Sequence, residues 1–113
     1  MSIVNAHELE MIFFQGFDRH FGSDALNMRI ATDEDIGRLS HLLEILFSQE
    51  KEFTPNAALQ EAGLRAIIST PQVGEIMLAE AEGRIIGMVS LLYTVSTALG
   101  ARVAILEDMI VDP

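Results

Sequence analysis

The feature of this sequence that most constrains the fold is a change in hydrophobic period near Gly74. Before it, apolar residues recur every three or four positions, which is typical of amphipathic helices. After it, apolar and polar residues alternate in stretches separated by short turns, which is typical of strands. Strands joined by tight turns form antiparallel sheets. The sequence therefore predicts an α+β fold with a mostly antiparallel sheet and helices packed on it.

Six elements are expected, in the order β-α-α-β-β-β. Thr32 and Asp35 form a capping box at the start of the first helix, and Asn56 caps the second, which ends before Pro71. Gly63, within the second helix, either allows close packing or costs about 1 kcal/mol of helix propensity. The expected bounds are a strand over residues 27–32, helices over 33–49 and from 57, a strand over 75–81, a tight turn at 82–83, a strand over 84–95 with a bulge position at Gly87, and a strand over 102–111.

Two adjacent acids, Glu107 and Asp108, interrupt the last apolar stretch of the chain. Carboxylates within a core strand are costly unless they lie at a sheet rim or in a polar cleft. This strand is therefore predicted to be both a structural centre and the wall of a site. By strand alternation, Glu107 shares its side with Met109 and Val111, whereas Asp108 points the opposite way unless a bulge shifts the parity. A solvated or hydrogen-bonded strand end is the alternative role for both acids.

Charge and composition exclude several classes of function. The net charge of −10, with only seven Lys and Arg, argues against nucleic acid or an anionic membrane as a partner. The absence of cysteine excludes disulfides and thiolate chemistry, and His7 and His20 have no ligand-spaced companions, so no metal site is expected. No apolar run approaches the roughly 20 residues of a membrane span, and the N-terminus lacks the basic start of a signal peptide. A cytoplasmic protein is expected.

Residues 1–27 form an aromatic-rich extension that differs from the domain expected over residues 28–113. Four of the six phenylalanines lie there, and its apolar residues recur at roughly helical spacing, although Gly16 and Gly22 disfavour a helix. Three interpretations remain open. The extension is an apolar helix packed on the domain, a mis-annotated leader upstream of a true start at Met28, or a partner-binding helix.

The order of elements from Met28 to Pro113 resembles the N-terminal half of the GNAT acetyltransferases, a superfamily of N-acetyltransferases. Three segments carry the resemblance: residues 28–35, the hairpin over 82–89, and the ending over 107–113, which looks like the V-x-P close of the family's fourth strand. The resemblance implies an acetyl-CoA-dependent enzyme that transfers an acetyl group to an amine. In such enzymes an R/Q-x-x-G-x-G/A loop follows this strand and holds the pyrophosphate of acetyl-CoA, and the sequence ends before it.

The resemblance also implies roles for residues of the last strand. Met109, Ile110 and Val111 match the segment whose backbone groups face the pantetheine arm and the acetyl carbonyl in a complete domain. Glu107 is the catalytic candidate, a base that would deprotonate an ammonium substrate. Tyr93 does not match the tyrosine that often protonates the leaving thiolate. Because the pyrophosphate loop is missing, the 113-residue chain alone is expected to be an inactive N-terminal fragment that does not bind acetyl-CoA with useful affinity.

Two other interpretations compete with the enzyme. One is a non-catalytic half-domain that associates through its exposed fourth strand with itself or with a complementing C-terminal half. The other is a small α+β ligand-binding domain that shares only the order of elements. An unpaired edge along residues 103–111 would favour self-association, unless the phenylalanine-rich extension folds across that edge within one chain.

Overall fold

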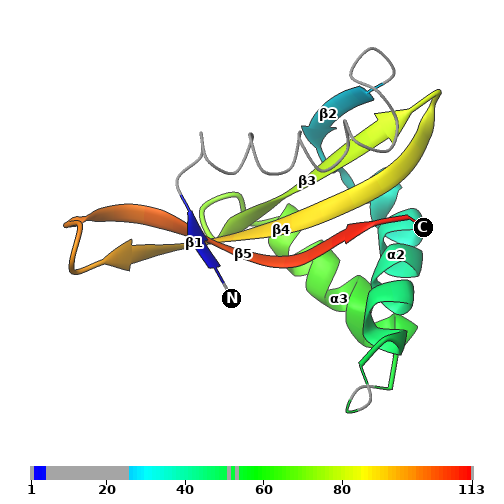
Figure 1. Ribbon diagram of the computed structural model, residues 1–113, viewed down its shortest axis with the longest axis horizontal. Helices are drawn as coiled ribbons and strands as arrows, with labels where there is room; N and C mark the ends of the chain where they lie inside the picture. Colours follow the sequence, from blue (N-terminus) through cyan, green and yellow to red (C-terminus); the bar gives the residue numbers. More distant parts are fainter. Residues whose placement is uncertain (1, 5–25, 51, 53, 113) are drawn as a thin grey trace.

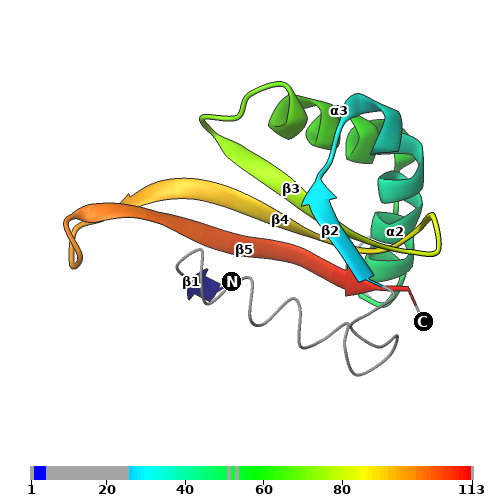
Figure 2. The same cartoon turned by 90° about the horizontal axis from the view of Figure 1, so that it is seen from above.

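The computed structural model describes residues 2–4, 26–50, 52 and 54–112. Its strands form one antiparallel sheet in the order β1-β5-β4-β3-β2, and α2 and α3 lie together on one face of it (Figures 1 and 2). The predicted α+β fold is confirmed. The described elements are β1 (Ser2–Val4), β2 (Leu26–Ile30), the 3₁₀ turn η2 (Asp33–Asp35), α2 (Ile36–Ser48), α3 (Ala57–Ile68), β3 (Gly74–Ala81), β4 (Arg84–Ser96) and β5 (Ala101–Val111).

Both helices begin at the residues that the sequence indicates. The backbone N–H of Thr32 donates to Asp35 Oδ2 at 2.8 Å, which is half of the expected capping box. Asn56 Oδ1 accepts from the backbone N–H of Leu59 at 3.1 Å. Each bond satisfies a backbone donor that a helix start would otherwise leave unpaired. The first helical segment differs from expectation only in opening as a 3₁₀ turn before α2 begins at Ile36.

The β3–β4 hairpin turns at Glu82-Gly83, where both residues have positive φ, 53° and 76°. Two consecutive left-handed residues are typical of a two-residue type I′ turn, which matches the twist of the flanking strands. The ladder between β3 and β4 shifts register after Ala79, which lies opposite Gly87. The irregularity expected at Gly87 is therefore present.

The sheet carries a hydrophobic cluster on each face. On the helix side, residues of α2 and α3 such as Leu42 and Leu64 pack against Leu78 and Met88 of the sheet. On the opposite face, Val89 lies at the centre of a second cluster of strand residues. The two clusters occupy alternate positions of the same strands, so β3 and β4 carry apolar residues on both faces and not on one alone.

The outer edge of β5 is partly covered. Ser2–Val4 pairs antiparallel with Ala104–Leu106, so a strand from the N-terminal extension lies beside the middle of β5 (Figure 1). Of the alternatives left open for this edge, coverage by the extension within one chain is therefore present at these positions. No described strand pairs with the outer edge of residues 107–111. The helix expected within the extension falls on residues 5–25, which lie outside the described residues.

Candidate functional site

The acidic part of β5 contains a β-bulge. Ser90 of β4 pairs with Glu107, whereas Met88 pairs with Ile110, so β5 carries one more residue than β4 across this interval. Within the bulge Asp108 has a φ of 52°, in the left-handed region that few residues with a side chain occupy. Backbone strain of this kind is concentrated at functional sites, so the bulge is the first candidate.

The bulge changes which way the acids face. Glu107 shares a sheet face with its cross-strand partner Ser90, whereas Met109 and Val111 pack into the cluster on the opposite face. The prediction that Glu107 shares its side with Met109 and Val111 is therefore wrong, because simple alternation does not hold across a bulge. Asp108 lies with Ser90 on the helix side, which is the shift of parity expected if the strand contains a bulge.

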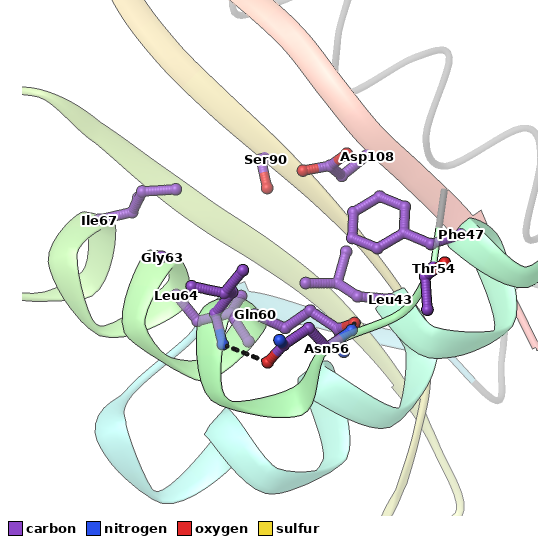
Figure 3. Close-up of a pocket in the computed structure, with 11 residues that line it drawn as sticks. Leu43, Phe47, Thr54, Asn56, Gln60, Gly63, Leu64, Ile67, Ser90 and Asp108 are labelled. Atoms are coloured by element: carbon purple, nitrogen blue, oxygen red, sulfur yellow. Dashed lines mark hydrogen bonds between the residues drawn. The ribbon is translucent and has the colours of Figure 1, made fainter. Parts of the chain in front are cut away.

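Asp108 borders a pocket of about 300 Å³ between the sheet and the two helices (Figure 3). The wall is mainly apolar, and α3 contributes one stripe of side chains at intervals of three and four residues. Such spacing places the stripe on one face of the helix. The lining residues are Leu43, Phe47, Thr54, Asn56, Leu59, Gln60, Gly63, Leu64, Ile67, Ser90 and Asp108.

Two of the polar lining residues hold the helices in place. The buried side-chain amide of Gln60 donates to the backbone oxygen of Ser40 at 3.0 Å and to its hydroxyl at 3.2 Å. The side-chain oxygen of Gln60 accepts from the backbone N–H of Asn56 at 2.9 Å. Since Asn56 also caps α3, these bonds fix the pocket wall, and the Gln60 side chain has little capacity left for a ligand.

The Asp108 carboxyl has an unusual environment. Burial raises the pKa of Asp108 above its ordinary value, and the negative charges of Glu107 and Glu50 raise the pKa further. Among the described residues, no hydrogen bond or ion pair stabilises its charged form. A carboxyl whose pKa is shifted upward is a better proton acceptor near neutral pH than an ordinary Asp, so the site contains a candidate general base.

The end of β5 is fixed by Asp112. Its carboxylate accepts from Arg38 Nη2 at 2.6 Å and from Arg84 Nη2 at 3.0 Å, and these two bonds hold the pKa of Asp112 below its usual range. The backbone N–H of Asp112 donates to the carbonyl of Ile86 on β4 at 2.7 Å. Because backbone groups alternate in direction along a strand, those of Val111 point to the outer edge, which no described strand pairs.

The predicted site residues therefore separate into two groups. Glu107 is half-buried and lies beside the pocket residue Asp108 without itself lining the pocket. Met109 and Val111 lie on the other face, and Ile110 is buried in the helix-side core. None of these positions tests the implied roles, which remain predictions.

Sequence reasoning did not identify the pocket. Its signals were an Asp inside a strand and a glycine in the middle of a helix, but neither says what surrounds the residue. In the part of the chain that the structure describes, no three His, Asp or Glu side chains are grouped so that they could hold a metal ion. No described helix is long and apolar enough to cross a membrane.

Comparison with known proteins adds information only at the level of structure. No protein-family model and no curated protein matches the chain. A "possible acetyltransferase" of Clostridium difficile 630 matches with a TM-score of 0.70 at 12% identity, covering 78% of this chain and 58% of that chain. A "predicted acetyltransferase" of Clostridium acetobutylicum, solved with acetyl-CoA, matches with a TM-score of 0.61 at 13% identity, covering 78% and 60%. A ribosomal-protein-alanine N-acetyltransferase of Brucella melitensis biovar Abortus 2308 matches with a TM-score of 0.57 at 17% identity, covering 78% and 57%.

These matches concern the fold. The chain spans somewhat more than half the length of the acetyltransferases it matches. The resemblance to part of a GNAT acetyltransferase domain is confirmed at that level.

Proposed function

We propose that this chain provides the amine-binding side of an acetyl-CoA-dependent N-acetyltransferase. The observation that carries the proposal is Asp108, held by a strained bulge between an apolar pocket on the helix side and the open outer edge of β5. The fold shared with acetyltransferases, one of them solved with acetyl-CoA, supports the same conclusion.

In the proposed reaction, Asp108 accepts a proton from the ammonium of the bound substrate. The resulting amine nitrogen attacks the thioester carbonyl carbon, a C–N bond forms, and the C–S bond breaks. The thiolate of CoA leaves and takes up the second proton that the nitrogen releases as the amide forms, which balances the reaction. A general base contributes about 10²–10⁴-fold to such a rate, and a raised pKa suits it to work near neutral pH.

The outer edge of β5 fits the pantetheine arm. Acetyl-CoA would supply the acetyl group as a thioester, and its arm carries amide groups that hydrogen-bond to backbone N–H and C=O. Val111 presents such groups to the outer edge, and by its implied role Met109 would extend that surface, whereas the same alternation turns the backbone groups of Ile110 toward β4. The 113 residues contain no R/Q-x-x-G-x-G/A segment after β5, so on their own they should bind acetyl-CoA weakly. A micromolar dissociation constant by titration calorimetry, about −8 kcal/mol, would contradict this.

Glu107 and Asp108 are both candidates for the base. Asp108 is favoured because it lines the pocket, while Glu107 acts on it by raising its pKa. The test uses the longest protein that the reading frame encodes, in an acetyl-transfer assay with a panel of amines. Asp108→Asn should lower kcat by about 10²–10⁴-fold with little change in the KM for acetyl-CoA. A larger loss of kcat in Glu107→Gln than in Asp108→Asn would make Glu107 the base in place of Asp108. Unchanged pH–rate profiles in both variants would refute a carboxylate base.

A second candidate function is association through β5. The outer edge of residues 107–111 has no described partner, and open strand edges recruit further strands. Such an edge would accept a second copy of the chain or a complementing C-terminal half. Light scattering coupled to size exclusion tests this across a dilution series, and a strictly monomeric species would argue against self-association.

A further inference from the structure

A glycine lies at the centre of the α3 stripe that lines the pocket. Gly63 is about one helical turn from both Leu59 and Ile67, and all three line the pocket. A Cβ added to Gly63 would meet no atom within 4 Å. Close packing therefore does not require glycine here, although glycine costs the helix about 1 kcal/mol relative to alanine. The effect of the missing side chain is open space on the pocket side of α3.

The pocket offers one charged group and few free polar ones. Asp108 is the only ionisable residue among the described residues that line the pocket. The Gln60 side chain is engaged in holding α3, which leaves the hydroxyls of Thr54 and Ser90 and the side-chain N–H groups of Asn56 as the uncharged polar groups open to a ligand. A ligand that fits these walls therefore has one positive charge at Asp108 and a mainly apolar body, because most of the wall consists of apolar side chains that give polar groups no partner.

Resting on the proposed function, which makes this pocket the amine site, we infer that the acceptor is a small free monoamine with a compact apolar body. Its ammonium lies at Asp108 and its body lies against α3, in the space that Gly63 leaves open. The volume, about 300 Å³, is at the lower end of the range for ligand pockets, which favours a small acceptor. A second ammonium would lie on the apolar wall, and most hydroxyls of an amino sugar would face apolar side chains.

Direct binding tests the inference without any acetyl transfer. The probes are 3-methylbutylamine, its uncharged analogue 3-methylbutanol, and 1,5-diaminopentane, titrated into the 113-residue protein and followed by amide chemical shifts. The monoamine should bind with shifts concentrated on α3 and around Asp108, and about tenfold more tightly than the alcohol or the diamine. Equal or tighter binding of the diamine, for example through Glu50 near the same carboxylate, would overturn the inference.

Substitutions locate the site. Gly63→Leu fills the pocket and should weaken monoamine binding by about tenfold or more, whereas Gly37→Leu, at an exposed helical glycine away from the pocket, should leave it unchanged. If Gly63→Leu does not fold, Gly63→Ala serves instead, because its added Cβ meets no atom. Gly63→Ala should still lower the affinity for the monoamine by about two- to threefold. Asp108→Asn should reduce binding of the monoamine but not of the alcohol. Wild-type affinity in the Gly63 variants would overturn the inference.

The failure of this inference can be distinguished from the failure of the proposed function. If the monoamine binds as described but the longest encoded protein transfers no acetyl group to it, the proposed function fails and the binding preference stands. If acetyl transfer occurs with diamines or amino sugars as readily as with monoamines, the proposed function stands and the inference is overturned.

Discussion

Replacing Asp108 by glycine should make the protein more stable while removing its proposed base. Two features of the native residue oppose folding. Its backbone has a φ of 52°, and its carboxylate is half-buried without a hydrogen-bond donor among the described residues. Glycine adopts this backbone conformation without strain and carries no charge. Stability and activity are therefore expected to change in opposite directions at this position.

The size of the effect follows from the backbone. A side chain in the left-handed region costs roughly 1–2 kcal/mol, and somewhat less for Asp, whose short polar side chain tolerates it. Against this, glycine adds about 0.4–1 kcal/mol of unfolded-state entropy. Removal of the buried charge adds to this gain. The free energy of unfolding of Asp108→Gly should therefore exceed that of wild type by about 0.5–1.5 kcal/mol at neutral pH. This corresponds to a rise in Tm of roughly 3–8 °C for a domain of this size.

The charge contribution can be separated by pH. Because the folded pKa of Asp108 is raised, the folded state holds its proton more tightly than the unfolded state does. The free energy of unfolding should then fall as pH rises from about 4, the unfolded pKa, through the raised folded pKa. Asp108→Asn, which tolerates the same backbone, should abolish this decline and keep the strain.

The assay is urea unfolding followed by circular dichroism between about pH 4 and pH 8, for wild type and the Gly, Asn and Ala variants of Asp108. Asp108→Ala keeps a Cβ and loses the side-chain oxygen, so it should be about 1 kcal/mol less stable than Asp108→Gly. Equal stability of the Ala and Gly variants would refute the strain. A pH dependence that persists in Asp108→Asn would refute the assignment of the titration to Asp108.

Two further predictions concern the scaffold. Gly74→Ala should destabilise the protein by about 2–4 kcal/mol in thermal unfolding, because its Cβ would collide with the backbone oxygen of Leu91. The matched change Gly37→Ala, in open space on α2, should instead stabilise by about 0.5–1 kcal/mol, and similar losses in both would contradict the collision. Asp35→Asn should lower the free energy of unfolding by about 1–2 kcal/mol at neutral pH. This is less than for a fully buried ion pair, because its partner Arg29 is partly exposed and solvent screens the pair. The hydrogen bond from Arg29 lowers the pKa of Asp35. The stabilisation by Asp35 is therefore present above about pH 4 and is lost as pH falls through the folded pKa. Acid unfolding midpoints that coincide in wild type and Asp35→Asn would contradict this.

Features encoded locally were predictable from the sequence. The helix caps at Thr32 and Asn56 and the turn at Glu82-Gly83 depend on side chains and backbone preferences within a few residues. The change of period at Gly74 depends only on spacing along one segment. The α+β fold followed from these signals because sequential strands pair with their neighbours.

Features that depend on two distant segments were not predictable. The bulge exists because the register of β4 at Ser90 requires one more residue on β5, and nothing within residues 107–110 specifies that offset. From the sequence alone, the side chain of Asp108 could therefore lie on either face of the sheet. The role of Gly63 depended on what lies across from α3, which a helical pattern does not contain. Coverage of the β5 edge by the extension was an open alternative, but the register that pairs Ser2–Val4 with Ala104–Leu106 joins segments about a hundred residues apart and has no local signal.

That pairing has a consequence for folding order and local opening. Placing Ile3 opposite Ile105 closes a loop of about a hundred residues, and closure entropy grows with loop length. The β2–β5 part of the sheet forms mainly through shorter-range contacts. We therefore expect β1 to pair with β5 last during folding and to separate from it first during local opening. In native-state hydrogen exchange, the outer-edge amides of Ala104–Leu106 should exchange through a low-energy opening, while those facing β4 wait for unfolding of the sheet. The outer edge of β5 would then open as a separate, less stable unit, ahead of the helices and the hairpin strands.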